Sequence, residues 1–388
     1  MDRQTDNSPS FGHLRLVDCV VVIYCVLRIL VWELPLFLVT CYLWRSESSA
    51  PFVSALPYFL VRKTNELLNP IALRWLTGSS SEYVNLVLTS RRYRPYRNNI
   101  YHALTRTDFK GFWVMQGSLQ NLESPSSSDL TILYLHGGGY ISSQPSHYLL
   151  FLLRLGEAIL EQGTSVSIFA LDYSLAPEHV FPAQLKEATA AYEYLINEEH
   201  ILPEKILIAG DSAGGHLALS FLVALANEHS LLRKRLPKPG GLVLMSPWLS
   251  LHNELPSFKI NAHKDVLPVI SSLNSLYLEF LTPEPAIEWD AVLPSWVWVS
   301  AGTDELFFDG VKTWVDILED RLGQERVTFV AGAEKVHVWQ WLQTIIDERM
   351  KKEVLEREMG DRKGFGATAA VGRAIAKHYL EQTFPDPG

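Results

Sequence analysis

The sequence predicts an α/β fold in which a mostly parallel sheet is covered by helices on both faces. From about residue 130 onward, short apolar runs alternate with longer segments that have helical periodicity. Continuous apolar runs are typical of strands buried on both faces, and such strands occur in parallel sheets. With 388 residues, the chain is long enough for one such domain and an additional segment.

The elements of this domain follow from the two periodicities. The predicted strands are residues 131–136, 165–173, 205–212, 241–248, 295–302 and 326–332. The predicted helices are residues 148–163, 181–199 and 213–228, with a further amphipathic helix near the C-terminus at 367–382. Pro182 falls in the first turn of one helix, where its missing N–H leaves no intrahelical hydrogen bond unmade.

Composition narrows the class of protein. The net charge is −9 and no basic cluster stands out, so we expect no nucleic-acid partner. All three cysteines, Cys19, Cys25 and Cys41, lie in one apolar N-terminal stretch. The rest of the chain therefore offers no disulfide, no thiolate metal site and no cysteine nucleophile. We expect neither a metal nor an organic cofactor.

The N-terminal region divides from the predicted catalytic domain. Residues 14–44 are strongly apolar, and we expect residues 1–48 to associate with a membrane. Arg28 and Glu33 interrupt this run, so one tilted span and a segment within one leaflet are both compatible with it. The alternative is a soluble chain whose N-terminal helices fold over the active site. Residues 49–118 are assigned to lid helices and lead-in, and residues 119–388 to the catalytic domain.

A Gly-x-Ser-x-Gly motif lies where one predicted strand ends and the next helix begins. It reads Gly210-Asp211-Ser212-Ala213-Gly214. Such an elbow brings backbone close on both sides of the serine, which glycine permits, and projects the hydroxyl above the sheet. The N–H of Ala213 begins the helix, where the helix dipole favours an anion. Ser212 is therefore the candidate nucleophile, against the plainer reading of a serine-capped turn.

A second glycine motif, His136-Gly137-Gly138-Gly139-Tyr140, follows the first predicted strand. Three glycines allow backbone N–H groups to converge on one point, as a tetrahedral oxyanion requires. A phosphate cradle is the alternative, but the Lys-Ser/Thr ending of a P-loop is absent. We interpret His136 as structural, because it precedes the serine whereas the base of this fold follows it.

The acid and base should follow the nucleophile in that order. The histidines beyond the serine are His216, His229, His252, His263, His337 and His378. His337 lies in a loop after the last predicted strand and is the candidate base, whereas His229 is expected to cap a helix and His378 to sit on one. The acid candidates are Asp304, Glu305 and Asp309, and Asp304 is favoured because it directly follows a strand.

Together the motifs at 136–140, 172–179 and 210–215 resemble the hormone-sensitive-lipase branch of the α/β-hydrolases. That branch includes bacterial esterases, arylacetamide deacetylase and fungal steryl acetyl hydrolases. The resemblance covers about residues 130–345 and implies an oxyanion hole formed by the N–H groups of Gly138, Gly139 and Ala213. It also implies a helical lid and a single-pass anchor in the endoplasmic reticulum. The chain departs from the family pattern at Glu305 and at Val338-Trp339.

We therefore expect a serine esterase with a Ser212–His337–Asp304 triad. The resemblance implies that it acts on a small lipophilic ester, such as an acetyl ester. Two alternatives remain at this point. The first is an acyltransferase that uses the same acyl-enzyme. The second is a ligand-binding protein on the same fold that has no catalytic activity.

Overall fold

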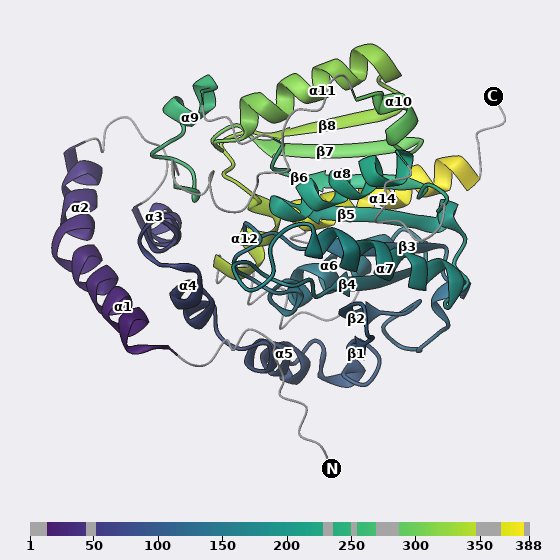
Figure 1. The fold of residues 1–388 in the computed structure, drawn as a ribbon, viewed down its shortest axis with the longest axis horizontal. Helices are drawn as coiled ribbons and strands as arrows, with labels where there is room; N and C mark the ends of the chain where they lie inside the picture. The colour runs from purple at the N-terminus through teal and green to yellow at the C-terminus, as the bar shows by residue number, and fades with distance from the viewer. Residues whose placement is uncertain are drawn as a thin grey trace.

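The computed structural model describes residues 14–43, 52–227, 236–249, 254–268, 287–346 and 366–383. At its centre lies an eight-stranded sheet in the order β1-β2-β4-β3-β5-β6-β7-β8 (Figure 1). Its strands are β1 (His102–Thr105), β2 (Lys110–Met115), β3 (Leu130–Leu135), β4 (Val166–Leu171), β5 (Ile206–Asp211), β6 (Gly241–Met245), β7 (Trp296–Gly302) and β8 (Val327–Gly332). Strands β3 to β8 pair in parallel, whereas β1 and β2 are antiparallel at one edge.

The sheet is buried on both faces, which explains why its strands are apolar throughout. Along β3, Leu133 and Leu135 belong to one hydrophobic core, and Ile132 and Tyr134 belong to the other. This alternation is the period-two geometry of a strand. One core is closed by α7 (Ala183–Asn197), α8 (Ala213–Ala226), α10 (Trp289–Val292) and α11 (Phe308–Leu322). The other is closed by α6 (Leu149–Leu160), α12 (Trp339–Ile346) and α14 (Ala367–Thr383).

The predicted fold class is confirmed, and the predicted parallel strands are present. The sheet also contains β1 and β2, which sequence periodicity did not predict. It therefore begins at His102, inside the segment 49–118 that we assigned to the lid and lead-in. The predicted cap residue His229 lies outside the described residues. His378 does lie on α14, where its ring stacks on Trp296 with 4.2 Å between centroids.

Three helices before the sheet cover one side of the catalytic domain: α3 (Phe52–Leu67), α4 (Pro70–Thr77) and α5 (Ser80–Thr89) (Figure 1). We call them the cap. The start of α4 is fixed by Asn69, whose side chain accepts a hydrogen bond of 2.8 Å from the N–H of Ala72. A capping box formed by Ser79 and Glu82 begins α5. These signals set where each short helix starts.

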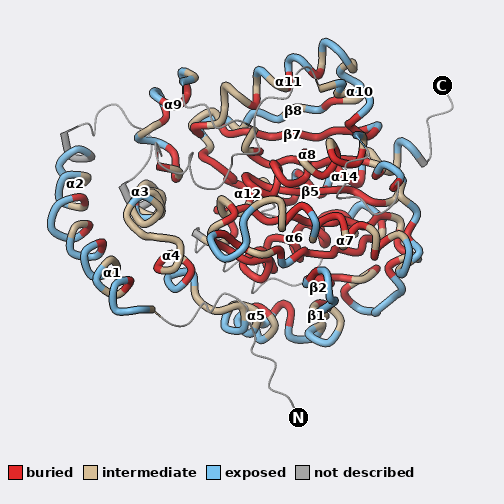
Figure 2. Tube along the Cα trace, in the orientation of Figure 1, coloured by how far each residue is buried: buried red, intermediate tan, exposed pale blue. Residues whose placement is uncertain are grey.

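Outside the cap lies the long apolar helix at the N-terminus. It runs as α1 (Leu16–Arg28), a π-helical turn (Ile29–Glu33) and α2 (Leu34–Leu43). The part from Leu16 to Thr40 is long and apolar enough to cross a membrane, by length and composition. In Figures 1 and 2 this helix lies beyond α3 and α4, and its outer side is exposed.

Candidate active site

Ser212 occupies a strained turn between β5 and α8. Its backbone angles are φ 50° and ψ −118°, in a region that residues with a Cβ rarely adopt. A Cβ on Gly210 would meet the carbonyl of Gly214 at 2.5 Å, and a Cβ on Gly214 would collide with the carbonyl of Leu135. Both glycines of the motif are therefore required by close backbone contacts. The strain aims the serine side chain out of the sheet at the end of a central strand.

The glycine-rich loop lies directly beside this turn. Gly138 and Gly139 have φ of 109° and 63°, which glycine alone adopts readily. A Cβ on Gly138 would collide with the carbonyl of Ser142, and one on Gly137 with the carboxylate of Asp211. The N–H groups of Ile141 and Ser142 donate to the Gly138 carbonyl and close the loop. The loop is thus held in one shape against the serine turn.

Asp211, next to the nucleophile candidate, fastens the glycine loop. Its carboxylate accepts hydrogen bonds from Tyr134 Oη at 2.6 Å, Tyr148 Oη at 3.0 Å and the Gly137 N–H at 2.9 Å. Burial raises the pKa of Asp211 to about 7, while these donors act in the opposite direction. Its role in this structure is to hold the loop and the turn together.

His337 lies in the loop between β8 and α12, beside the same cavity as Ser212. Its side chain is buried, and its ring meets Phe307 edge-on with 5.1 Å between centroids. Within the described structure, neither ring nitrogen has a hydrogen-bond partner. Burial lowers the pKa of His337 to about 3, so the ring is neutral and can accept a proton at neutral pH.

The three candidate acids have different environments. The Asp304 carboxylate forms an ion pair with Lys264 at 2.8 Å and is partly exposed. The Asp309 carboxylate accepts a hydrogen bond of 2.7 Å from the N–H of Ser257 in α9 (Pro256–Ile260). Only Glu305 is fully buried. The structure therefore places the favoured candidate, Asp304, at the surface next to a lysine.

Glu305 lies against the loop that carries the histidine. Its Oε2 accepts hydrogen bonds from Ser246 Oγ at 2.6 Å and from the Gly302 N–H at 2.9 Å. Ser246 Oγ in turn accepts from the N–H of Val338 at 3.0 Å, and Val338 is the neighbour of His337. Glu305 Oε1 has no hydrogen-bond partner in the described structure. Burial, followed by repulsion from Asp265, raises the pKa of Glu305 well above its usual value.

Asp265 is a site residue that sequence reasoning missed. It is fully buried, and its carboxylate accepts hydrogen bonds from the N–H groups of Val266, Leu306 and His337 at 2.7 to 2.9 Å. It therefore fixes the acid loop and the histidine loop relative to each other. No motif surrounds it in the sequence, so nothing there distinguishes it from a surface aspartate.

Two other histidines stabilise the surroundings of the site. His136 is buried, stacks on Tyr173 with 4.0 Å between centroids, and faces the Gly137 carbonyl through Nδ1. His216 Nδ1 and Tyr140 Oη form a hydrogen bond of 2.6 Å, and Tyr140 directly follows the three glycines of the loop. Burial lowers the pKa of both histidines, to about 3 and about 4. These neutral rings brace the loop, as was interpreted for His136.

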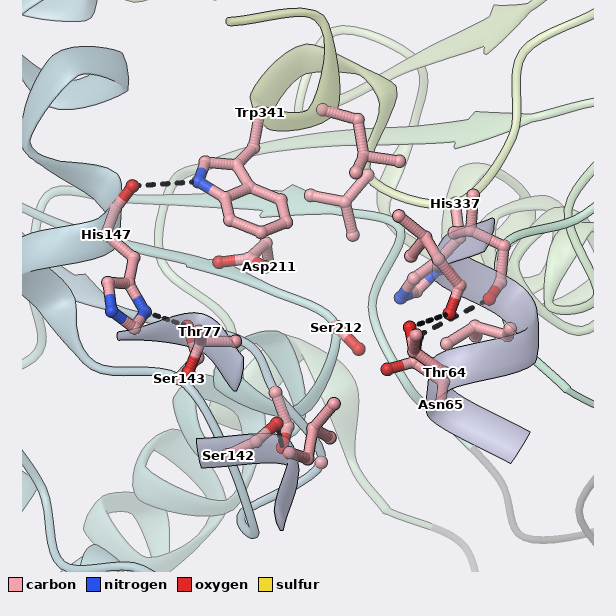
Figure 3. Close-up of a pocket in the computed structure, with 18 of the residues that line it drawn as sticks. Thr64, Asn65, Thr77, Ser142, Ser143, His147, Asp211, Ser212, His337 and Trp341 are labelled. Carbon is pink, nitrogen blue, oxygen red and sulfur yellow. Dashed lines mark hydrogen bonds between the residues drawn. The ribbon is translucent and has the colours of Figure 1, made fainter. Parts of the chain in front are cut away.

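A cavity of about 470 Å³ joins these parts (Figure 3). Gly138, Gly139, Ser212 and His337 all line it, together with residues of the cap. The cap contributes apolar and small polar side chains to the lining: Val61, Thr64, Asn65, Leu73, Leu76, Thr77 and Tyr83. Among the described residues, no group of three His, Cys, Asp or Glu side chains is placed to hold a metal ion.

One buried arginine joins the cap to the catalytic loops. Arg74 of α4 donates to the carbonyl of Ile141 at 2.7 Å, to the carbonyl of Ala176, and to both carboxylate oxygens of Glu178 at 2.9 Å. Its side chain is 3% exposed. Ile141 belongs to the glycine loop, so a cap residue holds the loop that carries Gly138 and Gly139.

Comparison with known proteins agrees with this architecture. A family model described as the α/β-hydrolase fold matches residues 132–340. An acetyl-hydrolase of Streptomyces hygroscopicus is 30% identical over 226 residues, which are 56% of this chain and 71% of that protein. Human arylacetamide deacetylase-like 2 is 33% identical over 167 residues, 41% of this chain and 39% of that protein. The chain thus spans less than half of this second relative.

Solved structures show the same fold. The structure of a bacterial esterase from the hormone-sensitive lipase family has a TM-score of 0.59 and 22% identity, and the match covers 86% of this chain and 99% of that one. The resemblance inferred from the motifs is confirmed. Since the family model matches more than half of its residues, this chain belongs to the α/β-hydrolase fold family.

Proposed function

We propose that the protein is a serine esterase that hydrolyses carboxylic esters through an acyl-enzyme on Ser212. The observation that carries this proposal is the strained backbone of Ser212, which points the side chain into a cavity shared with His337 and the glycine loop. Strain of this kind is concentrated at functional sites. The named activities of the relatives, an acetyl-hydrolase and bacterial esterases, support the same chemistry.

The proposed reaction has two steps, acylation of Ser212 and hydrolysis of the acyl-enzyme. His337 takes the proton of Ser212 as its Oγ attacks the ester carbonyl, and the N–H groups of Gly138, Gly139 and Ala213 stabilise the resulting oxyanion. Collapse of the tetrahedral intermediate breaks the C–O bond, and the departing alcohol receives the proton from His337. Water, deprotonated by His337, then attacks the acyl-enzyme. Collapse of the second tetrahedral intermediate breaks the bond to Ser212 Oγ, which takes the proton back from His337, and the carboxylic acid is released.

We further propose that Glu305, and not Asp304, is the acid that supports His337. Glu305 is buried and has an unpaired Oε1, and the ring nitrogens of His337 are buried and unpaired as well. Burial raises the pKa of Glu305, but a positive charge that forms on His337 favours the ionised carboxylate. That carboxylate would accept a hydrogen bond from Nδ1, orient the ring and stabilise the imidazolium. Asp304 is neutralised at the surface by Lys264.

The proposed substrate is a lipophilic ester with a short acyl group. The cavity is lined mostly by apolar side chains, with Trp248, Phe307 and Trp341 among them. Burial of apolar substrate surface against these side chains stabilises the complex by about 25 cal/mol per Å². The short acyl group is proposed from the acetyl-hydrolase relative.

The nucleophile is tested with p-nitrophenyl esters of increasing acyl length. Ser212→Ala should lower kcat by roughly three orders of magnitude or more, because the acyl-enzyme can no longer form. Wild type should also react covalently with a fluorophosphonate, and the variant should not. Activity of the variant within tenfold of wild type, in a sample free of other esterases, would remove Ser212 from the mechanism.

The two acids are separated by isosteric variants. Glu305→Gln should lower kcat on the order of 10²- to 10⁴-fold, since an amide cannot stabilise the imidazolium. Asp304→Asn should change kcat less than about threefold, because its ion pair is exposed to solvent. Thermal unfolding of both variants serves as the control for misfolding. The opposite ranking would return the role to Asp304.

The pH dependence tests the environment of the base. Only the neutral ring accepts a proton, so kcat/KM should rise as the pH rises through the pKa of His337 in the free enzyme. Burial lowers that pKa to about 3, so we expect the rising limb below the ordinary histidine value of ~6.5. Rates for an uncharged ester between pH 4 and 9 should therefore be nearly constant, because the limb lies below this window. A limb at or above pH 7 would show that a neighbouring carboxylate outweighs burial.

The Arg74 contacts predict an effect of the cap on catalysis. Arg74→Met leaves the carbonyls of Ile141 and Ala176 without this donor and should lower the free energy of unfolding by about 1–3 kcal/mol. A displaced glycine loop should also lower kcat by on the order of tenfold or more. Arg74→Lys should recover only part of both, because an ammonium cannot reproduce the planar fork. Unchanged kcat in a folded Met variant would contradict the expectation.

A further inference from the structure

The N-terminal helix has the reverse of the polarity expected for a helix on a water-soluble protein. Its inward face carries Asp18, Cys25, Ile29 and Glu33, all buried. Its outer face carries large apolar side chains that are 43–83% exposed: Leu16, Val17, Val20, Ile23, Tyr24, Val26, Leu27, Leu30, Val31, Trp32, Leu36, Leu38 and Val39. A soluble helix turns its apolar side inward and its charges outward.

The inward charges hold the helix on the cap. Asp18 accepts a hydrogen bond of 3.0 Å from Asn69, the N-cap of α4. Glu33 forms an ion pair with Lys63 of α3 at 3.1 Å. Further along the helix, the ring of Phe37 stacks on the ring of Phe59 in α3, with 4.3 Å between centroids. Both ends and the middle of the helix are therefore attached to the cap along its length.

The breadth of the outer face indicates what covers it. At 3.6 residues per turn, the exposed apolar positions of α1 span roughly half of the helix circumference. The described helix from Leu16 to Thr40 is 25 residues long, which is about 37 Å. A second protein surface covers a stripe of a helix, whereas acyl chains surround every side that is not already packed. The outer face thus matches a lipid phase.

The attachment to the cap determines the orientation of the helix. A span across the bilayer with these contacts intact would carry α3 into the hydrocarbon, together with Arg62, Lys63 and Glu66. A span without them would separate Asp18 from Asn69 and Glu33 from Lys63. It would leave Arg15–Asp18 and Arg28–Glu33 as ion pairs on the membrane helix, and moving ion pairs out of water is still unfavourable. An orientation in the plane of the membrane avoids both costs.

We propose that the helix from α1 to α2 lies in the plane of one leaflet of a phospholipid bilayer while it remains docked on the cap. This arrangement differs from the single-pass anchor implied by the family resemblance. It also places the cap between the bilayer and the cavity. Leu76 of α4 lines the cavity and is 50% exposed, which provides apolar surface at the cap itself. A lipophilic ester dissolved in the leaflet would then be concentrated close to the active site.

The first experiment measures flotation of the full-length chain with phosphatidylcholine vesicles. Wild type should float. Val20→Glu/Leu27→Glu, which changes two exposed outer-face residues, should lower the partition coefficient on the order of a hundredfold. The matched control Leu202→Glu/Ile317→Glu changes two exposed apolar residues elsewhere and should float like wild type. Hydrolysis of a water-soluble ester should be the same for all three. Wild type that stays in solution, alone or as a dimer formed by the outer face, would overturn the proposal.

The second experiment determines topology and needs no substitution. Full-length wild type with a different epitope at each terminus is inserted into sealed microsomes and treated with protease. Because an in-plane helix does not cross the bilayer, both epitopes should be on the same side and should be digested or protected together. Protection of one epitope and loss of the other would establish a span and overturn the proposal. A result of this kind leaves the esterase proposal untouched, since activity is measured separately.

Discussion

Close backbone packing around Ser212 is the constraint on which the site depends. Gly214 lies against the carbonyl of Leu135 at the end of β3, and no side chain fits between them. The turn that exposes the serine is therefore locked to the strand that leads into the glycine loop. The proposed nucleophile and the proposed oxyanion donors do not need to be brought together by a later movement, because neighbouring parallel strands already deliver both to the same edge of the sheet.

Buried carboxylates extend this order to the remaining loops. Asp211 holds the glycine loop, and Asp265 ties the loop before α11 to the loop that carries His337. Burial raises the pKa of both carboxyl groups, which means that removing the charged form from water costs free energy. Hydrogen bonds from tyrosine hydroxyls and backbone N–H groups offset that cost. These directional hydrogen bonds specify the positions of the loops in a way that apolar packing alone would not.

The sequence predicted those features that local chemistry determines. The parallel strands follow from apolar periodicity, and Ser212 from the need for glycine on both sides. β1 was missed because it is a short edge strand of four residues with only partial burial. β2 does carry a short apolar run, but it lies before the region in which strands and helices alternate regularly. The sequence favoured Asp304 over the adjacent Glu305 because Asp304 directly follows a strand. It could not show which of the two side chains is buried, since tertiary packing decides which carboxylate turns inward. The sequence could not predict the role of Asp265, because its hydrogen-bond partners come from three separate segments of the chain.

The contacts of Arg74 have a consequence for exchange of the cap in this protein. A lid is often regarded as an exchangeable module that alters specificity while the catalytic core stays constant. Here the guanidinium of Arg74, a cap residue, binds two residues of the core, Ile141 and Glu178. A foreign lid grafted onto this core would need an arginine at the same place. Arg74 therefore ties the cap to a loop outside it, whereas Leu76 and Thr77 of the same helix line the cavity and take no part in those side-chain contacts.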